Sequence, residues 1–160
     1  LVLRRQRQMC IRDRLSHFNP TDTLCVRPSS ESLDWGGPGA VLNIGMNDER
    51  CSHLSKHIGE KSASELYFRF IQAYSVNVAR LDPDVFDHIT RANGNSVSAA
   101  LAAYTDEMDE SFPQSIEHQL SEVLRSMARA WEGTSARLLR EAKGAPADAG
   151  LGLVLSLIHI

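Results

Sequence analysis

The sequence predicts an α+β fold that is predominantly α-helical and carries two or three short strands. From residue 62 to residue 143, apolar side chains recur with the period of amphipathic helices, and caps and glycines divide this region into segments. Short apolar runs at residues 24–27, 40–46 and 151–154 flank the helical region and are bounded by Gly, Pro and polar residues, which is typical of strands.

Both ends of the chain are predicted to be non-native. Residues 155–160 can be encoded by CTGTCTCTTATACACATC, and the reverse complement of this string, read one base in, encodes residues 9–14. Opposite strands of one DNA element at both ends resemble a transposase-based sequencing adapter. We therefore expect residues 1–14 and 155–160 to be adapter-derived and to make no native packing, and residues 15–154 to be a partial domain. The alternative is a basic nucleic-acid-binding arm and an apolar terminal strand.

Setting the ends aside changes the charge balance. The first 14 residues carry five Arg and one Asp, which leaves 12 basic and 19 acidic residues and a formal net charge of −7 rather than −3. Nothing then favours a nucleic-acid or membrane partner, and no apolar run reaches the roughly 18 residues of a spanning helix. Cys25 and Cys51 without a signal peptide favour reduced thiols and a cytoplasmic location.

The first strand is expected over residues 24–27, with Cys25 as a small core residue and Pro28 ending the strand because proline cannot donate to a ladder. Residues 40–46 should form a second extended segment. Asn47 and Asp48 can cap a short helix over residues 49–58, which Gly59 ends.

Five further helices are expected, and residues 151–154 should begin a strand. Each helix is assigned a polar cap, a capping box or a proline in its first turn. These assignments are Ser62 with Glu65, Asp82 with Pro83, Ser96, Phe112 with Pro113, and Thr134. The helix that begins near Phe112 is the longest and most amphipathic, and Gly133 should end it.

Residues 24–48 contain the strongest candidate site. An apolar strand that ends in Arg27 leads into a loop with three Gly and three Ser. Such a strand end presents a cation and free backbone N–H groups to an anion, for example a nucleotide phosphate. The loop lacks the glycine spacing of a P-loop or a dinucleotide fold, so a surface hairpin loop is the alternative.

Other patterns carry less weight. His53 and His57 lie four apart on a predicted helix, but no third metal ligand is evident, and two polar side chains on the solvent-facing side of the helix are the better explanation. The acidic residues 106–110 read as a solvated helix end rather than a cation site. The loop serines have neither a partnered His nor a nucleophile elbow.

Several motifs together resemble the pyruvate phosphate dikinase family. They are Cys-Val-Arg at 25–27, Val-Leu-Asn-Ile-Gly-Met-Asn-Asp at 41–48, Tyr-Phe-Arg-Phe-Ile-Gln-Ala-Tyr at 67–74, Phe-Pro-Gln at 112–114 and Ala-Trp at 130–131. Their order and spacing match over nearly all of residues 15–154. The resemblance implies the middle of an N-terminal ATP-binding domain, an incomplete ATP-grasp-like nucleotide site with a helical insertion. The family converts pyruvate, ATP and phosphate to phosphoenolpyruvate, AMP and pyrophosphate through a phosphohistidine, reversibly and with magnesium.

The resemblance implies ATP-binding roles for two residues. Arg27 matches the arginine of the family's Ser-Val-Arg-Ser strand end, and Gly36 matches the glycine of its Met-Pro-Gly turn. The loop departs from the family's pattern, which is Gly-Ala-Arg-Ala-Ser-Met-Pro-Gly-Met-Met. At the same length, this chain has Ser-Ser-Glu-Ser-Leu-Asp-Trp-Gly-Gly-Pro. The structural alternative is that Arg27 pairs with Glu31 or Asp48.

The resemblance implies ATP and Mg²⁺ as cofactors. Besides ATP, the implied partners are the phosphohistidine domain and the pyruvate-binding domain of the same parent chain. Whether the parent protein is a homodimer is left open. No catalytic or metal-binding residue is assigned, because none of the histidines at 53, 57, 88 and 118 lies in the phosphohistidine motif. The chain alone should be inactive. The alternative function belongs to a different class: a divergent, non-catalytic helical interaction module that keeps the fold.

Overall fold

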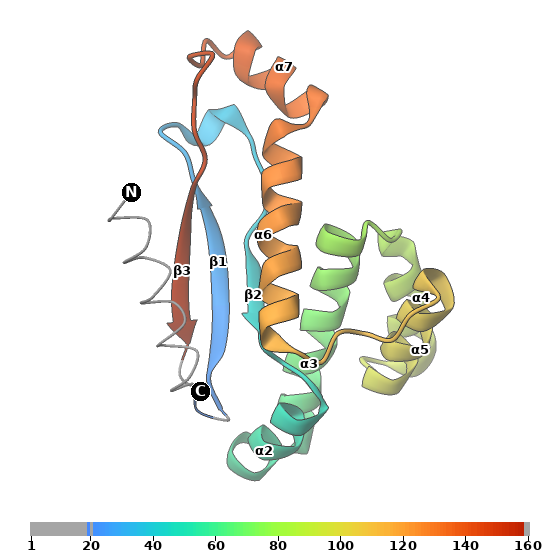
Figure 1. Ribbon diagram of the computed structural model, residues 1–160. Helices are drawn as coiled ribbons and strands as arrows, with labels where there is room; N and C mark the ends of the chain where they lie inside the picture. Colours follow the sequence, from blue (N-terminus) through green and yellow to red (C-terminus); the bar gives the residue numbers. More distant parts are fainter. Residues whose placement is uncertain (1–18, 20, 159–160) are drawn as a thin grey trace.

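The computed structural model describes residue 19 and residues 21–158 and confirms a predominantly helical α+β fold (Figure 1). Its strands β1 (Thr23–Ser29), β2 (Val41–Ile44) and β3 (Gly152–Ile158) form an antiparallel sheet in the order β2-β1-β3. Its helices are α2 (Asp48–Ile58), α3 (Glu60–Tyr74), α4 (Pro83–Asn93), α5 (Val97–Met108), α6 (Ile116–Glu132) and α7 (Thr134–Ala142). A 3₁₀ turn η1 (Leu33–Trp35) precedes β2, and a π-helical turn η2 (Ser75–Ala79) follows α3.

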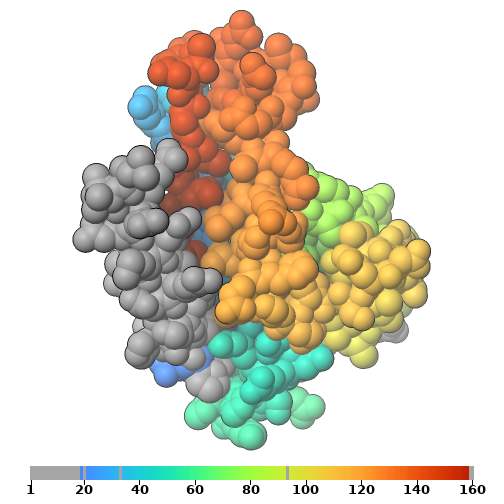
Figure 2. Space-filling model, in the orientation of Figure 1, coloured from blue at the N-terminus to red at the C-terminus, as the bar shows by residue number. Residues whose placement is uncertain are grey.

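The helices α3 and α6 cover the sheet where β1 and β2 pair. In Figure 1 α6 runs beside the strands, α2 lies at one end of the molecule, and α7 lies at the other end with the loop that joins β1 to β2. Figure 2 shows α6 along the face turned to the viewer, with α7 above it. Leu24, Val26, Val41 and Ile44 are buried in the core that the sheet shares with α3 and α6. None of the described helices combines the length and apolarity that crossing a membrane requires.

Strand β1 is longer than predicted, because it continues through Pro28 to Ser29. Its pairing with β2 stops at Val26, which lies opposite Val41, whereas Pro28 lies opposite Leu153 of β3. Beyond Val26 the described part of β1 thus has a neighbour on one side only, and a residue without an N–H group is tolerated there.

The pairing of β1 with β2 contains an irregularity. Leu24 lies opposite Ile44 and Val26 opposite Val41, so β2 has one residue more than β1 between the two pairs. Asn43 lies in this stretch with a φ of 59°, a conformation that Asn accepts more readily than most residues. The extra residue lets both Val41 and Ile44 turn into the core.

Residues 155–158, which were predicted to make no native packing, are part of the edge strand β3. In β3, Leu155 lies opposite Val26 and Leu157 opposite Leu24. Such a ladder needs only extended backbone and β-prone side chains, so it does not identify the origin of these residues. The adapter boundary stays a prediction, and residues 1–14 lie outside the described part of the chain.

Several helix ends follow the predicted caps. Asn47 Oδ1 accepts a hydrogen bond from the Arg50 backbone N–H at 2.8 Å, and Asp82 and Ser96 cap α4 and α5 in the same manner. Gly59 ends α2 with a φ of 87°, a left-handed conformation that glycine adopts without strain.

Three predicted caps are wrong. Helix α3 begins at Glu60, directly after Gly59, so Ser62 and Glu65 form no capping box. Glu65 instead accepts hydrogen bonds from Arg69 and Asn95. Helix α6 begins at Ile116 with Ser115 as its cap, and α7 follows Gly133 without a side-chain cap from Thr134.

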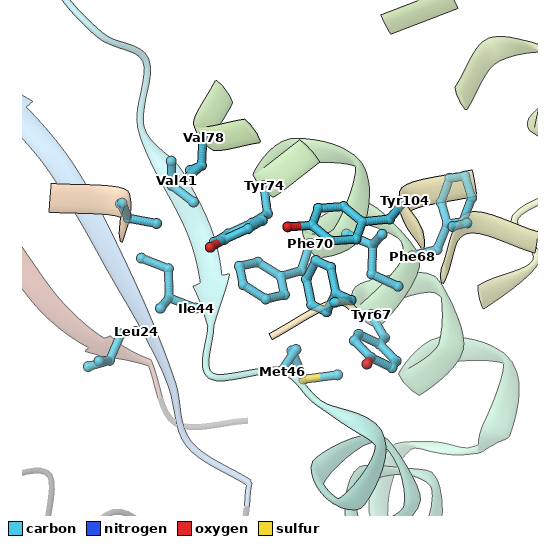
Figure 3. Close-up of a cluster of buried hydrophobic side chains, with 14 of the residues drawn as sticks. Leu24, Val41, Ile44, Met46, Tyr67, Phe68, Phe70, Tyr74, Val78 and Tyr104 are labelled. Atoms are coloured by element: carbon cyan, nitrogen blue, oxygen red, sulfur yellow. The ribbon is translucent and has the colours of Figure 1, made fainter. Parts of the chain in front are cut away.

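Phe112 lies at the centre of an aromatic cluster rather than at a helix start. Its ring centroid is 5.2 Å from that of Tyr104, 5.3 Å from Tyr74, 5.8 Å from Phe70 and 6.3 Å from Tyr67. All four contacts are edge-on, which is the favoured geometry of aromatic pairs. Figure 3 shows the surrounding core. Packing of Phe112 against α3 and α5 holds this segment off the axis of α6 and explains the later helix start.

Candidate functional site

Arg27 projects from the sheet face opposite to the core. Alternation places Arg27 on the opposite face from Val26, together with Cys25. Cys25 is buried, and exposure on this face begins at Arg27. Within residues 21–158, the Arg27 side chain makes no ion pair and no hydrogen bond, and the alternative pairing with Glu31 or Asp48 is not formed. A fixed positive charge is therefore left available at the end of β1.

The loop after β1 forms hydrogen bonds between its own residues. The Ser30 hydroxyl donates a hydrogen bond of 2.7 Å to the Ser32 carbonyl oxygen, and Ser32 Oγ accepts one of 3.3 Å from the Asp34 backbone N–H. These bonds shape the turn η1 and take up the hydroxyls of two of the three loop serines.

The loop glycines fit tightly against the corner between α6 and α7. Gly36 has a φ of 70°, and a Cβ built there would lie 2.9 Å from Cδ2 of Leu139. Gly37 has a φ of 136°, and its Cβ would lie 3.4 Å from the ring of Trp131. The backbone conformation therefore favours glycine at Gly36, whatever the loop binds, and a Cβ there would also displace the exposed side chain of Leu139.

The same corner is fixed by Trp131 and Arg140. The Arg140 guanidinium lies 3.8 Å from the centroid of the Trp131 ring and donates a hydrogen bond of 2.7 Å to the Trp131 carbonyl oxygen. Trp131 Nε1 donates to the Ala149 carbonyl oxygen at 3.3 Å. Since Arg140 is 8% exposed and already paired, it holds the support of the loop and is not a free cation.

A cavity of about 220 Å³ lies behind the loop. Its walls are Gly37 to Gly39, the start of β2, η2 and α6, and the exposed Arg80 is on its rim. The Ser126 hydroxyl donates to the Asn77 carbonyl oxygen at 2.7 Å within these walls. Sequence reasoning missed Arg80, because a single Arg between a helix and an Asp-Pro pair carries no distinguishing signal.

Other residues of the motifs link separate segments of the fold by hydrogen bonds and do not form a binding site. Gln114 Oε1 accepts a hydrogen bond from the Asp48 backbone N–H at 3.0 Å, and Gln114 Nε2 donates to the Tyr67 hydroxyl at 3.1 Å. That hydroxyl donates to Asp48 Oδ1 at 2.9 Å. Burial, together with the nearby Asp48 carboxylate, raises the pKa of Tyr67 far above its usual value. Three motifs distant in sequence therefore meet at the start of α2.

No candidate metal site is found among the described residues, where no group of three His, Cys, Asp or Glu side chains could hold an ion. His53 is half-buried and His57 exposed on α2. Cys25 is a buried free thiol, as predicted for a core residue, and Cys51 is a half-buried one whose pKa burial raises.

The comparisons with known proteins connect the chain to pyruvate, phosphate dikinases. It is 36% identical over 67 residues to those of Rickettsia felis and Rickettsia conorii, a match that covers 41% of this chain and 8% of each relative. It is 28% identical over 145 residues to that of Rhizobium meliloti, covering 79% of this chain and 16% of the relative. The chain therefore spans less than a fifth of the curated relatives it matches. No protein-family model matches it.

Proposed function

We propose that this chain contributes the arginine side of an ATP-phosphate site in a pyruvate phosphate dikinase-like phosphotransferase. The observation that carries the proposal is Arg27, an exposed and unpaired cation at the end of β1, directly before a loop that contains three glycines. The similarity to the dikinases supports it. The parent enzyme would form phosphoenolpyruvate, AMP and pyrophosphate from pyruvate, ATP and phosphate.

The guanidinium of Arg27 suits this role. Its planar fork can donate two parallel hydrogen bonds to a phosphate, and each charge-assisted hydrogen bond contributes about 1.5 to 3 kcal/mol. Its contribution grows if the closed site excludes water while charge develops on the leaving phosphate. Arg27 then favours the transition state over bound ATP.

Gly36 contributes to the proposed site by setting the course of the loop backbone. With a φ of 70° it turns the chain beside Leu139, and the absence of a Cβ lets the loop backbone lie close to that side chain. The fold around the site is proposed to be part of an ATP-grasp-like domain, with α2 to α5 as its helical insertion. Magnesium would help to neutralise the phosphates, with its ligands supplied by other parts of the parent chain.

Kinetics of the intact parent protein test the proposal. Arg27→Lys keeps the charge but loses the fork, and should lower kcat/KM for ATP by at least about tenfold. Arg27→Ala loses both and should lower it by about a hundredfold or more. Both variants should keep the melting temperature of the parent, because Arg27 is exposed and unpaired. Arg91→Ala, which removes another exposed cation on α4, is the matched control and should leave kcat/KM unchanged. Normal turnover by Arg27→Ala would remove Arg27 from the site.

A further inference from the structure

The cavity of about 220 Å³ behind the loop has a positively charged lining. Arg80 is the charged residue of this lining, and none of the described residues around the cavity contributes a carboxylate. Other cavities among the described residues do include carboxylates, for example Asp48, Glu122 and Asp148. In a chain with a net charge of −3, a lining whose charge is an arginine favours an anion. Arg27 does not line this cavity, so the cavity is separate from the proposed ATP-phosphate contact.

The lining supplies hydrogen-bond donors that the described part of the chain does not use. The Arg80 guanidinium is exposed and makes no ion pair or hydrogen bond within residues 21–158. The backbone N–H groups of Gly37 and Gly39, which belong to the loop wall of the cavity, also donate to no described residue. A guanidinium and backbone N–H groups are typical donors to a carboxylate or a phosphate.

The backbone that leads to Arg80 has an unusual conformation. The preceding η2 is a π-helical turn, a rare form that occurs frequently at functional sites, and the N–H groups of Arg80 and Leu81 both donate to the Ser75 carbonyl oxygen. Arg80 itself has a φ of 67° and a ψ of 28°, a left-handed conformation that costs free energy for a residue with a Cβ. Glycine or asparagine would adopt it at lower cost. The chain thus keeps an arginine at the rim of the cavity where another residue would be less strained.

The inner lining of the cavity is apolar. It contains side chains from β2, η2 and α6 that are at most 9% exposed, namely Val41, Val78, Val123 and Met127. Figure 3 shows Val41 and Val78 next to each other. A ligand that matches both parts of the lining has an anionic head and a small apolar body.

We propose that this cavity binds a short, branched carboxylate, with its head group at Arg80 and its alkyl part against the apolar lining. The carboxylate would accept two parallel hydrogen bonds from the guanidinium and further ones from the N–H groups of Gly37 and Gly39. The alkyl part would pack against Val123 and Met127. Inorganic phosphate fits less well, because it has no apolar part to cover these side chains.

NMR titration of the 160-residue chain tests this site, with 3-methylbutanoate as the probe. Its uncharged counterpart is 3-methylbutan-1-ol, and inorganic phosphate is an anion without an apolar body. At low salt, the carboxylate should bind saturably with a Kd on the order of 1 mM. The methyl resonance of Met127 and the amide resonances of Gly37 and Gly39 should shift with the same dependence on concentration. The alcohol and phosphate should each bind at least about tenfold more weakly.

Three variants and one control locate the binding. Arg80→Gly removes the cation and relaxes the backbone, so it should weaken carboxylate binding by about tenfold or more without lowering the melting temperature. Arg80→Lys keeps the charge but loses the fork and should weaken binding by roughly threefold. Ala130→Leu fills part of the cavity without changing its charge and should weaken binding by about tenfold. Arg91→Gln removes an exposed cation outside the lining and should change nothing.

The two parts of the proposed ligand are therefore tested separately. Weaker carboxylate binding by both Arg80→Gly and Ala130→Leu, with melting temperatures that show both variants to be folded, supports the site. Absence of saturable 3-methylbutanoate binding overturns the proposal, as does equal binding of the alcohol or of phosphate. Unchanged carboxylate binding by Arg80→Gly overturns it as well.

Discussion

Gln119 and Gly45 lie 74 residues apart and are joined by a buried hydrogen bond of 2.8 Å, from the Gly45 backbone N–H to Gln119 Oε1. Gln119 is fully buried, and its Nε2 donates to the carbonyl oxygens of Met46 at 3.0 Å and Pro113 at 2.7 Å. One side-chain amide thus replaces the backbone partners that the chain lacks where it leaves β2 and where it approaches α6.

Replacing Gln119 by Met should strongly destabilise the fold. Met fills similar space but leaves one buried N–H and two buried carbonyl groups without this partner, which costs about 2 to 4 kcal/mol in the free energy of unfolding. Urea unfolding at pH 7 measures the change. Gln72→Met on α3, where the amide makes no hydrogen bond within the described residues, should cost less than about 1 kcal/mol. Equal losses for both variants would contradict the bridging role of Gln119.

The hydroxyls of Tyr67 and Tyr104 should differ in their contribution to stability. Tyr67→Phe removes the group that links Asp48 to Gln114 and should cost about 1 to 2 kcal/mol. Tyr104→Phe removes a hydroxyl without a protein partner and should change stability by less than about 0.5 kcal/mol. Thermal or urea unfolding of the two variants side by side decides this, and the reverse order would show that the hydrogen-bond assignment is wrong.

Local signals in the sequence predicted much of the helical region, because caps act over a few residues. Asn47, Asp82 and Ser96 end up as the predicted caps. The start of α6 could not be predicted in this way, since Phe112 is drawn into contacts with α3 and α5 that only the folded chain provides. Pro28 was misread for a similar reason, because its tolerance depends on which strands lie beside β1.

Stability should fall at alkaline pH. The pKa values of Tyr67, Tyr74 and Tyr104 are all raised by burial, for Tyr104 to about 12, so the folded state keeps protons that the unfolded state loses near pH 10. The contribution is fully present below pH 10 and is lost as the pH rises through the folded pKa. Each tyrosine lowers the free energy of unfolding by at most about 1.4 kcal/mol per pH unit.

Urea unfolding between pH 8 and pH 12 checks this dependence. Tyr104→Phe should flatten the decline above pH 10, since one raised pKa is gone. The Cys51 thiol, whose pKa is also raised, adds a smaller decline that begins at lower pH, and Cys51→Ser separates it from the tyrosines. A profile that stays level to pH 12 would be incompatible with buried, protonated tyrosines.

Gly36→Ala should destabilise the loop for two separable reasons. The new Cβ costs about 1 kcal/mol or more at a φ of 70°, and it meets Leu139 at 2.9 Å. Adding Leu139→Ala to Gly36→Ala should recover only the part of the stability loss that is due to the steric contact. Gly59→Ala has a φ of 87° but open space around the Cβ, so it reports the backbone cost alone. Melting temperatures should fall more for Gly36→Ala than for Gly59→Ala, and the opposite ranking would refute close packing at Gly36.

The chain alone should bind ATP weakly and show no dikinase activity. Arg27 and the glycine loop form one side of the proposed site, and the chain spans 8% to 16% of the relatives it matches. A calorimetric titration with Mg-ATP should give no affinity tighter than about 100 μM, and pyruvate should not be converted to phosphoenolpyruvate. Micromolar binding would mean that the chain holds a complete nucleotide site.

The candidate site was only partly predictable. Strand alternation places Arg27 on the opposite face of β1 from Val26, but it does not predict that Arg27 is exposed, since Cys25 on the same face is buried. The support of the loop by Trp131 and Leu139 could not be predicted, because these residues lie on helices that reach the loop only through the tertiary fold.

The pairing of β1 with β3 predicts the order in which the molecule assembles. Thr23 pairs with Ile158, so the helical region lies entirely within the loop that this pairing closes, whereas Val26 and Val41 meet across a short loop. Closing the longer loop costs more entropy, and contacts of such sequence separation form slowly. The β1–β2 hairpin and the helices should therefore form first and β3 should dock last. In the native protein, the amide hydrogens of β3 should then exchange with solvent by local detachment, long before those around Gly45 and Gln119.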